Sequence, residues 1–134
     1  MEPQDANLAA VDALIELYDP QTQELINGAR SVLRAAFPKV TETADPKARL
    51  LGYSYGPGYK GTVATLILSK SAVKIGIPFG ATLADPKHLL SGAGKVHRHV
   101  PIARPAELKA PALRTLLKDA FTAWRARNGD TSAG

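Results

Sequence analysis

The chain has 134 residues, with a hydrophobic content of 45% and a charged content of 22%, values that are typical of one globular domain and argue against disorder. It contains no cysteine, so disulfide bonds and cysteine-ligated zinc are excluded and a cytoplasmic location is expected. The first residues lack the basic and apolar segments of a secretory signal, and no apolar run approaches the roughly 20 residues of a membrane span.

The net charge of +5 hides an asymmetry along the chain. Residues 1–24 contain six acidic side chains and no lysine or arginine, whereas the other 110 residues contain all 17 basic side chains and six acidic ones. We therefore expect anions to be attracted to the body of the domain rather than to its N-terminal segment.

Two amphipathic helices are predicted in the N-terminal part of the chain. Apolar residues recur at a spacing of three to four over 5–18 and again over 20–36. Asp19 is a good N-cap and Pro20 suits the first helical position, so the second helix is expected to begin there. Pro38 then ends it.

The middle of the chain has the pattern of strands. Short segments rich in branched and aromatic residues, separated by turn residues, are predicted as strands over 40–43, 50–55, 62–68, 73–79 and 96–102.

Helical segments follow these strands. A helical turn is predicted over 85–90, because Asp-Pro repeats the cap-and-proline pattern, and a final amphipathic helix is predicted over 110–127. Helices at both ends of a run of strands predict an α+β fold, in which an antiparallel sheet of about five short strands packs against N-terminal and C-terminal helices. The small residues of 128–134 predict a frayed, disordered tail.

The glycine-rich segment after the predicted helical turn brings flexible backbone and positive charge together. Gly92, Gly94 and Lys95 resemble part of a phosphate-binding loop. The full spacing of a nucleotide P-loop is missing, which excludes that motif. A looser anion-binding turn and a plain helix-to-strand turn both remain open.

The strand that follows carries an arginine and two histidines. Alternation places Arg98 on the same face as apolar neighbours, where a guanidinium needs a carboxylate, a carbonyl cluster or a ligand anion. An internal pair with Asp85 and a bound anion both satisfy this requirement. His97 and His99 lie on the other face, and the imidazoles would make anion binding weaken as pH rises through their titration.

Two tyrosines share one face of an earlier strand. Tyr53 and Tyr55 are expected to line an open face of the sheet together with His97 and His99. Aromatic residues near lysines also suit single-stranded nucleic acid, but no RNP-type aromatic pattern is present, so nucleic acid is not favoured. A homodimer interface or a helix-covered face fits the same tyrosines.

Asp12, Glu16 and Asp19 form part of an acidic stripe on the first helix. Their carboxylates suit iron or another hard cation, and they equally suit a solvated helix face. The sequence shows neither a Gly-x-Ser-x-Gly elbow nor a paired histidine–carboxylate motif, so a non-enzymatic role is favoured.

The order of these motifs resembles the YdhG-like family of uncharacterised bacterial domains. The matching residues are Asp85, Pro86, Leu89, Leu90, Gly92, Gly94, Lys95, Arg98, His99 and Val100. The resemblance covers about 18–127, which implies a single domain there with 1–17 as a helical extension, and it implies helices packed on an antiparallel sheet. One branch of the family is similar to frataxin-type iron chaperones, which would imply iron delivery.

From these patterns we expect a protein that binds a small anionic ligand or an acidic partner surface. The expected ligand-binding residues are Gly92, Gly94, Lys95, Arg98, His99, Tyr53 and Tyr55. The alternative is an iron chaperone that uses Asp12, Glu16 and Asp19, with iron as the only cofactor considered.

Overall fold

The computed structural model describes residues 3–56, 61–92 and 96–128. In chain order these residues form α1 (Pro3–Ile15), α2 (Pro20–Ala36), β1 (Thr41–Asp45), β2 (Leu50–Ser54), β3 (Thr62–Leu68), β4 (Val73–Ile77), the 3₁₀-helix η2 (Gly80–Thr82), β5 (Arg98–Ile102), the 3₁₀-helix η3 (Pro105–Lys109) and α3 (Pro111–Arg127). The five strands form one antiparallel sheet in the order β1-β2-β3-β4-β5. The predicted α+β fold is confirmed.

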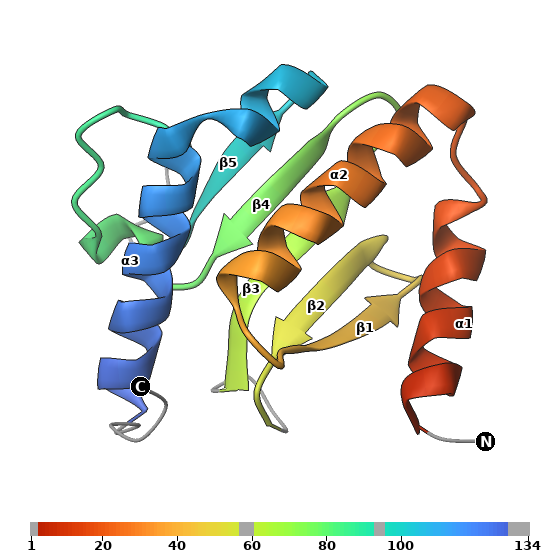
Figure 1. The fold of residues 1–134 in the computed structure, drawn as a ribbon, viewed down its shortest axis with the longest axis horizontal. Coiled ribbons are helices and arrows are strands. Elements are labelled where there is room, and N and C mark those ends of the chain that lie inside the picture. Colours follow the sequence, from red (N-terminus) through yellow and green to blue (C-terminus); the bar gives the residue numbers. More distant parts are fainter. Residues whose placement is uncertain (1–2, 57–60, 93–95, 129–134) are drawn as a thin grey trace.

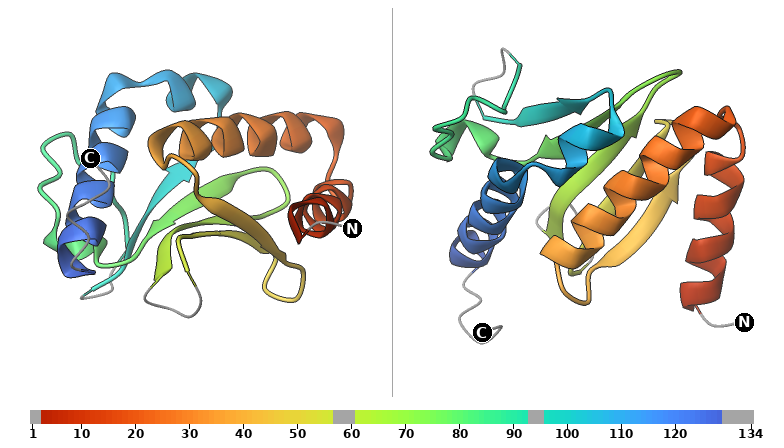
Figure 2. Two further views of the ribbon diagram at one scale, coloured as in Figure 1. Left: turned by 60° about the horizontal axis from the view of Figure 1, so that its bottom comes forward. Right: turned by 45° about the horizontal axis from the view of Figure 1, so that its top comes forward.

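The helices lie on one side of the sheet. α2 and α3 cover the same face, and α1 lies beside β1 at the edge of the sheet (Figures 1 and 2). In the described part of the chain, no α-helix covers the opposite face, which we call the open face. None of the described helices combines the length and the apolarity that crossing a membrane requires.

Alternation along the strands separates the two faces of the sheet. Leu66 of β3 and Ile75 of β4 are in register, and both are fully buried beneath the helices. The neighbouring register pair, Thr65 and Gly76, points to the open face and is partly exposed. The helices complete the core with apolar residues that include Leu25, Ile26, Ala29 and Leu33 of α2 and Leu113, Leu116, Leu117, Ala120 and Trp124 of α3.

α2 begins at the predicted residue. The Asp19 carboxylate accepts a hydrogen bond from the Thr22 N–H at 2.7 Å, and Pro20 occupies the first turn. Hydrogen bonds from the Thr22 backbone and hydroxyl lower the pKa of the Asp19 carboxyl. The aspartate therefore satisfies an N–H group that the helix itself leaves unpaired.

β4 and β5 are each two residues shorter than predicted, and the bounds of β1 and β2 differ from the prediction by one or two residues. β4 ends at Ile77 because Pro78 has no N–H to donate and Phe79 adopts a left-handed φ of 58°. β5 begins at Arg98 rather than two residues earlier, because Pro78, opposite His97, has no N–H and the Phe79 N–H donates to the His97 Nδ1 atom instead of a backbone carbonyl.

The helical turn predicted over 85–90 was wrong. The two carboxylate oxygens of Asp85 accept hydrogen bonds from the N–H groups of Leu89 and Leu90 at 2.9 and 2.8 Å. Aspartate competes in this way with the helical pattern of the backbone. The segment is consequently an aspartate-tied turn in which His88 has a positive φ of 54°.

α1 contributes to the same hydrophobic core as the rest of the chain. Val11, Leu14 and Ile15 are at most 4% exposed. α1, which lies within the helical extension predicted over 1–17, is thus packed against the body of the domain, next to β1. The tail predicted over 128–134 lies outside the described residues, except for Asn128, which caps α3.

Candidate functional site

A hollow of about 290 Å³ opens on the open face of the sheet, between β3, β4 and the beginning of β5. We call it the β5 hollow. Its lining residues are Thr62, Thr65, Ile67, Gly76, Ile77, Pro78, His97, Arg98 and His99. The lining thus includes two threonines, two histidines and an arginine, and none of the lining residues is acidic.

Gly76 is one of the residues that line the β5 hollow. It lies between Thr65 and His99 in the sheet register. A Cβ atom at Gly76 would be 2.3 Å from the Thr65 hydroxyl oxygen. The Thr65 hydroxyl therefore occupies the space that a side chain at Gly76 would take, and it places a polar group over the glycine backbone.

Arg98 supplies a fixed positive charge beside the β5 hollow; it pairs with the buried Ile77 in the sheet register, so its side chain leaves β5 on the face opposite to that of Gly76 and His99. The side chain is half-buried, and its Nη1 donates a hydrogen bond to the Gly92 carbonyl at 3.1 Å. Among the described residues, no carboxylate lies within ion-pairing distance of Arg98. The internal pair with Asp85 is absent, because the Asp85 carboxylate is bound to the backbone of its own turn.

The two histidines occupy different settings. The His97 Nδ1 accepts the Phe79 N–H at 3.1 Å, and the two rings meet edge to face with centroids 5.6 Å apart. His99 is held by backbone hydrogen bonds to Ser91 of 2.7 and 3.1 Å. His97 therefore helps to fix the turn after β4, while the half-buried His99 lies in the sheet beside Gly76.

Gly92 brings the glycine-rich segment against β5. Its φ is +117°, and a Cβ atom there would be 3.4 Å from the His99 imidazole. The structure thus brings together three predicted ligand-binding residues, Gly92, Arg98 and His99. Gly94 and Lys95 lie outside the described residues, so their predicted role stays a prediction.

Tyr53 and Tyr55 do not join this site, and the prediction that they line an open face with the histidines was wrong. Tyr53 is fully buried beneath the helices. The Tyr55 ring lies against Trp124 with centroids 5.1 Å apart, and its hydroxyl donates to the Pro38 carbonyl at 2.8 Å. Burial raises the pKa of Tyr55 to about 12. The helix-covered face, one of the alternatives for these tyrosines, is the one observed.

The Tyr53 hydroxyl belongs to a polar cluster that the sequence reasoning missed. Glu42 of β1 accepts two hydrogen bonds from Arg30 of α2, at 2.9 and 3.0 Å, and a third from the Tyr53 hydroxyl. The Arg30 and Glu42 side chains are only 12% and 10% exposed. The interruption of the apolar stripe of α2 by an arginine was the one signal that pointed to such a partner.

The pKa values in this cluster move in the directions that pairing predicts. Burial alone would raise the pKa of the Glu42 carboxyl, but the hydrogen bonds from Arg30 and Tyr53 outweigh it and hold that pKa below its usual value. The hydrogen bond to Glu42 raises the pKa of Arg30. Burial, together with the Glu42 charge, raises the pKa of Tyr53. The cluster is a satisfied structural ion pair rather than a reactive site.

The three carboxylates proposed to bind iron do not form a site. The Asp19 carboxylate caps α2. Asp12 and Glu16 are exposed, and across the described ranges no three histidine or acidic side chains gather closely enough to hold a metal ion. The exposure of Asp12 and Glu16 fits the alternative interpretation of the acidic stripe, which is a solvated helix face.

Comparison with protein-family models, with curated protein sequences and with solved structures finds no match to the chain. The function is therefore inferred from the residues of the site itself.

Proposed function

We propose that this protein binds a small anionic ligand in the β5 hollow. The observation that carries the proposal is the Arg98 guanidinium, which makes one hydrogen bond to a carbonyl and, within the described residues, no ion pair. A half-buried guanidinium of this kind retains donors for a carboxylate, phosphate or sulfate.

Other residues that line the β5 hollow suit the same chemistry. Thr62 and Thr65 offer hydroxyl donors, and His99 adds a positive charge when it is protonated. The hollow is small, at about 290 Å³, which favours a small anion over an acidic protein surface. Membership in the YdhG-like family stays a prediction, and no arrangement of the described residues favours the iron alternative.

Thermal unfolding in sulfate tests the proposal, with chloride at matched ionic strength as the reference. A ligand at about ten times its Kd stabilises the folded state by about 1.4 kcal/mol, which for a domain of this size raises the Tm by roughly 4–6 °C. Arg98→Gln is expected to remove this rise. Lys74→Gln removes an exposed charge from the same sheet face and is expected to keep it.

Two results would discard the proposal. One is an equal effect of sulfate and chloride on the wild-type protein, since that leaves only general salt effects. The other is an equal response of the Arg98 and Lys74 variants, because the charge of the domain as a whole would then be responsible rather than the hollow.

A further inference from the structure

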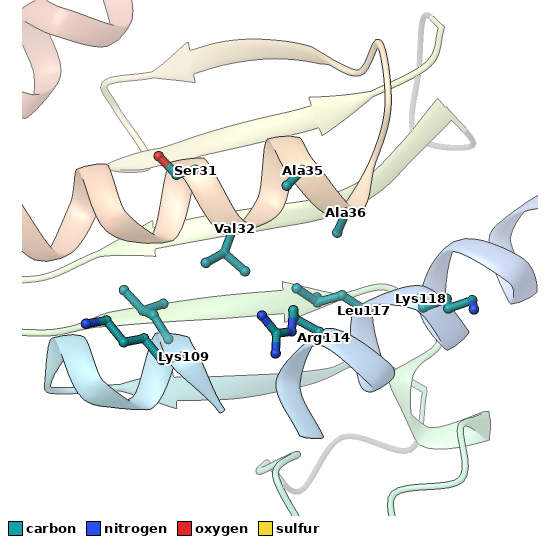
Figure 3. A pocket seen from close by; sticks show the side chains of 9 residues that line it. Ser31, Val32, Ala35, Ala36, Lys109, Arg114, Leu117 and Lys118 are labelled. Carbon is teal, nitrogen blue, oxygen red and sulfur yellow. The ribbon is translucent and has the colours of Figure 1, made fainter. Parts of the chain in front are cut away.

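A second cavity lies between the helices, on the other side of the sheet from the β5 hollow. It has a volume of about 570 Å³ and runs between α2 on one side and η3 and α3 on the other (Figure 3). We call it the helix groove. Its lining residues are Ser31, Val32, Ala35, Ala36, Leu108, Lys109, Arg114, Leu117 and Lys118.

Small side chains on α2 leave the helix groove open. Ser31 and Ala35 lie one turn apart on the wall, and Val32 and Ala36 follow at the same spacing, so no large side chain of α2 fills the space. Leu117 lies beneath them and is fully buried. The result is an apolar strip with the buried Leu117 at its base.

η3 packs tightly against α2 and limits the length of the groove. A Cβ atom at Gly28 of α2 would be 2.9 Å from the Leu108 Cδ1 atom, so the two elements are in direct contact there. Leu108 itself is 7% exposed. The groove thus has a defined wall on the η3 side, as small-molecule sites commonly have, and its volume lies within the roughly 300–1,000 Å³ of such sites.

Three cations surround this apolar strip. Arg114 lies across the middle of the groove, and Lys109 and Lys118 lie toward its two ends (Figure 3). All three are exposed, and in the described part of the chain none of them forms an ion pair. No carboxylate lines the groove.

The acidic residues of the neighbouring elements are directed elsewhere. The Glu107 carboxylate accepts hydrogen bonds from the N–H groups of Ala103 and Arg104, both at 2.8 Å. Asp119 of α3 lines a different hollow, which it shares with residues of the Asp85 turn. The positive charge over the helix groove is therefore not balanced from within the described residues.

From this combination we infer that the helix groove binds a small amphiphilic anion, namely a single short alkyl chain or ring that carries a carboxylate. The apolar part lies along Val32, Ala35 and Ala36, and the carboxylate accepts hydrogen bonds from the Arg114 guanidinium. The stems of the arginine and lysine side chains cover the apolar part from above. A helical peptide binds through several apolar anchors spread over two or more turns, whereas Val32, Ala35 and Ala36 span only about one turn of α2.

Titration of the 15N-labelled full chain with octanoate, followed by NMR, tests this inference. Octanoate is expected to shift the amide signals of α2 and α3 around the groove. Acetate, which lacks the chain, and octylamine, which has the opposite charge, are expected to bind at least about tenfold more weakly.

Three variants separate the groove from general effects. Arg114→Gln is expected to weaken octanoate binding about tenfold, and Ala35→Leu is expected to block it by filling the strip. Lys47→Gln, an exposed cation in the turn between β1 and β2, is expected to leave it unchanged. Because Arg114, Ala35 and Lys47 are all exposed, these substitutions are expected to leave the fold intact.

Several outcomes would overturn the inference. They are the absence of octanoate binding, equal effects of Arg114→Gln and Lys47→Gln, and equal binding of octanoate and octylamine. Binding of an acidic amphipathic helical peptide, but not of octanoate, with the same sensitivity to Arg114→Gln would also overturn it and assign the groove to a protein partner. Sulfate binding in the β5 hollow is independent of all these outcomes.

Discussion

Replacement of Glu42 by glutamine removes the charge that holds Arg30 and Tyr53 together between α2 and the edge of the sheet. The carboxylate accepts hydrogen bonds of 2.9 and 3.0 Å from Arg30, and both side chains are nearly buried. Leaving one partner of a fully buried ion pair uncompensated costs about 3–5 kcal/mol. Here a glutamine oxygen still accepts one hydrogen bond, and Arg30 keeps its bond to Asn27, so we expect a loss of about 2–3 kcal/mol.

Urea unfolding measures this loss directly, and thermal unfolding is expected to show a fall in Tm of roughly 6–12 °C. The control is Glu24→Gln, which removes an exposed carboxylate from the same helix as Arg30 and is expected to cost less than about 0.5 kcal/mol. Equal losses for the two variants would refute the conclusion that the Arg30–Glu42 pair stabilises the fold.

The pH dependence of the same pair has a defined sign. The pKa of the Glu42 carboxyl is lower in the folded state than its ordinary value. The carboxylate therefore contributes fully to the free energy of unfolding above the unfolded pKa of about 4.3, and this contribution is lost as pH falls through the folded pKa. The difference in unfolding free energy between the wild-type protein and Glu42→Gln is therefore expected to shrink in acid. A difference that stays constant down to about pH 2 would contradict this assignment.

Three further predictions follow from single contacts. Gly76→Ala is expected to weaken sulfate binding while costing no more than about 1 kcal/mol, because the facing Thr65 hydroxyl can rotate away; unchanged sulfate affinity would argue against the β5 hollow. Burial raises the pKa of Tyr55 to about 12 in the folded state, whereas a tyrosine in the unfolded chain has a pKa of about 10. The stabilising contribution of Tyr55 to the free energy of unfolding is therefore complete below about pH 10 and is lost as pH rises toward 12. Urea unfolding of Tyr55→Phe should consequently show a shallower decline above about pH 10, and an identical decline would count against this reading. Asp19→Ala is expected to lower the Tm by removing the cap on the Thr22 N–H, and a Tm equal to that of the exposed-site variant Asp12→Ala would contradict it.

Much of the fold was predictable because it depends on local patterns. The periodicity of α2, its Asp19 cap and its first-turn proline appear together in the sequence, and the helix starts at the predicted residue. β3 likewise has the predicted bounds, because its branched residues and flanking turn residues are local signals. In these segments, tertiary contacts agree with the local preference of the chain.

The candidate site was less predictable because it depends on which sheet face the helices cover. Alternation correctly placed Tyr53 and Tyr55 on one face of the sheet, but it does not say which face the helices cover. In the structure the helices cover the face that carries the two tyrosines. The sequence also left the partner of Arg98 undecided, because the Asp85 carboxylate could pair with Arg98 or bind the backbone of its own turn. In the structure it accepts hydrogen bonds from that turn. The hollow beside Gly76 depends on strand register, which the sequence alone does not specify.

The most direct test of anion binding is an NMR titration of the wild-type protein and Arg98→Gln with sodium sulfate, in a background of constant ionic strength. We predict saturable shifts of the Gly76 and His99 amide signals in the wild-type protein and their loss in the variant. Shifts of the same size in both proteins, or shifts that bypass these two residues, would contradict the account.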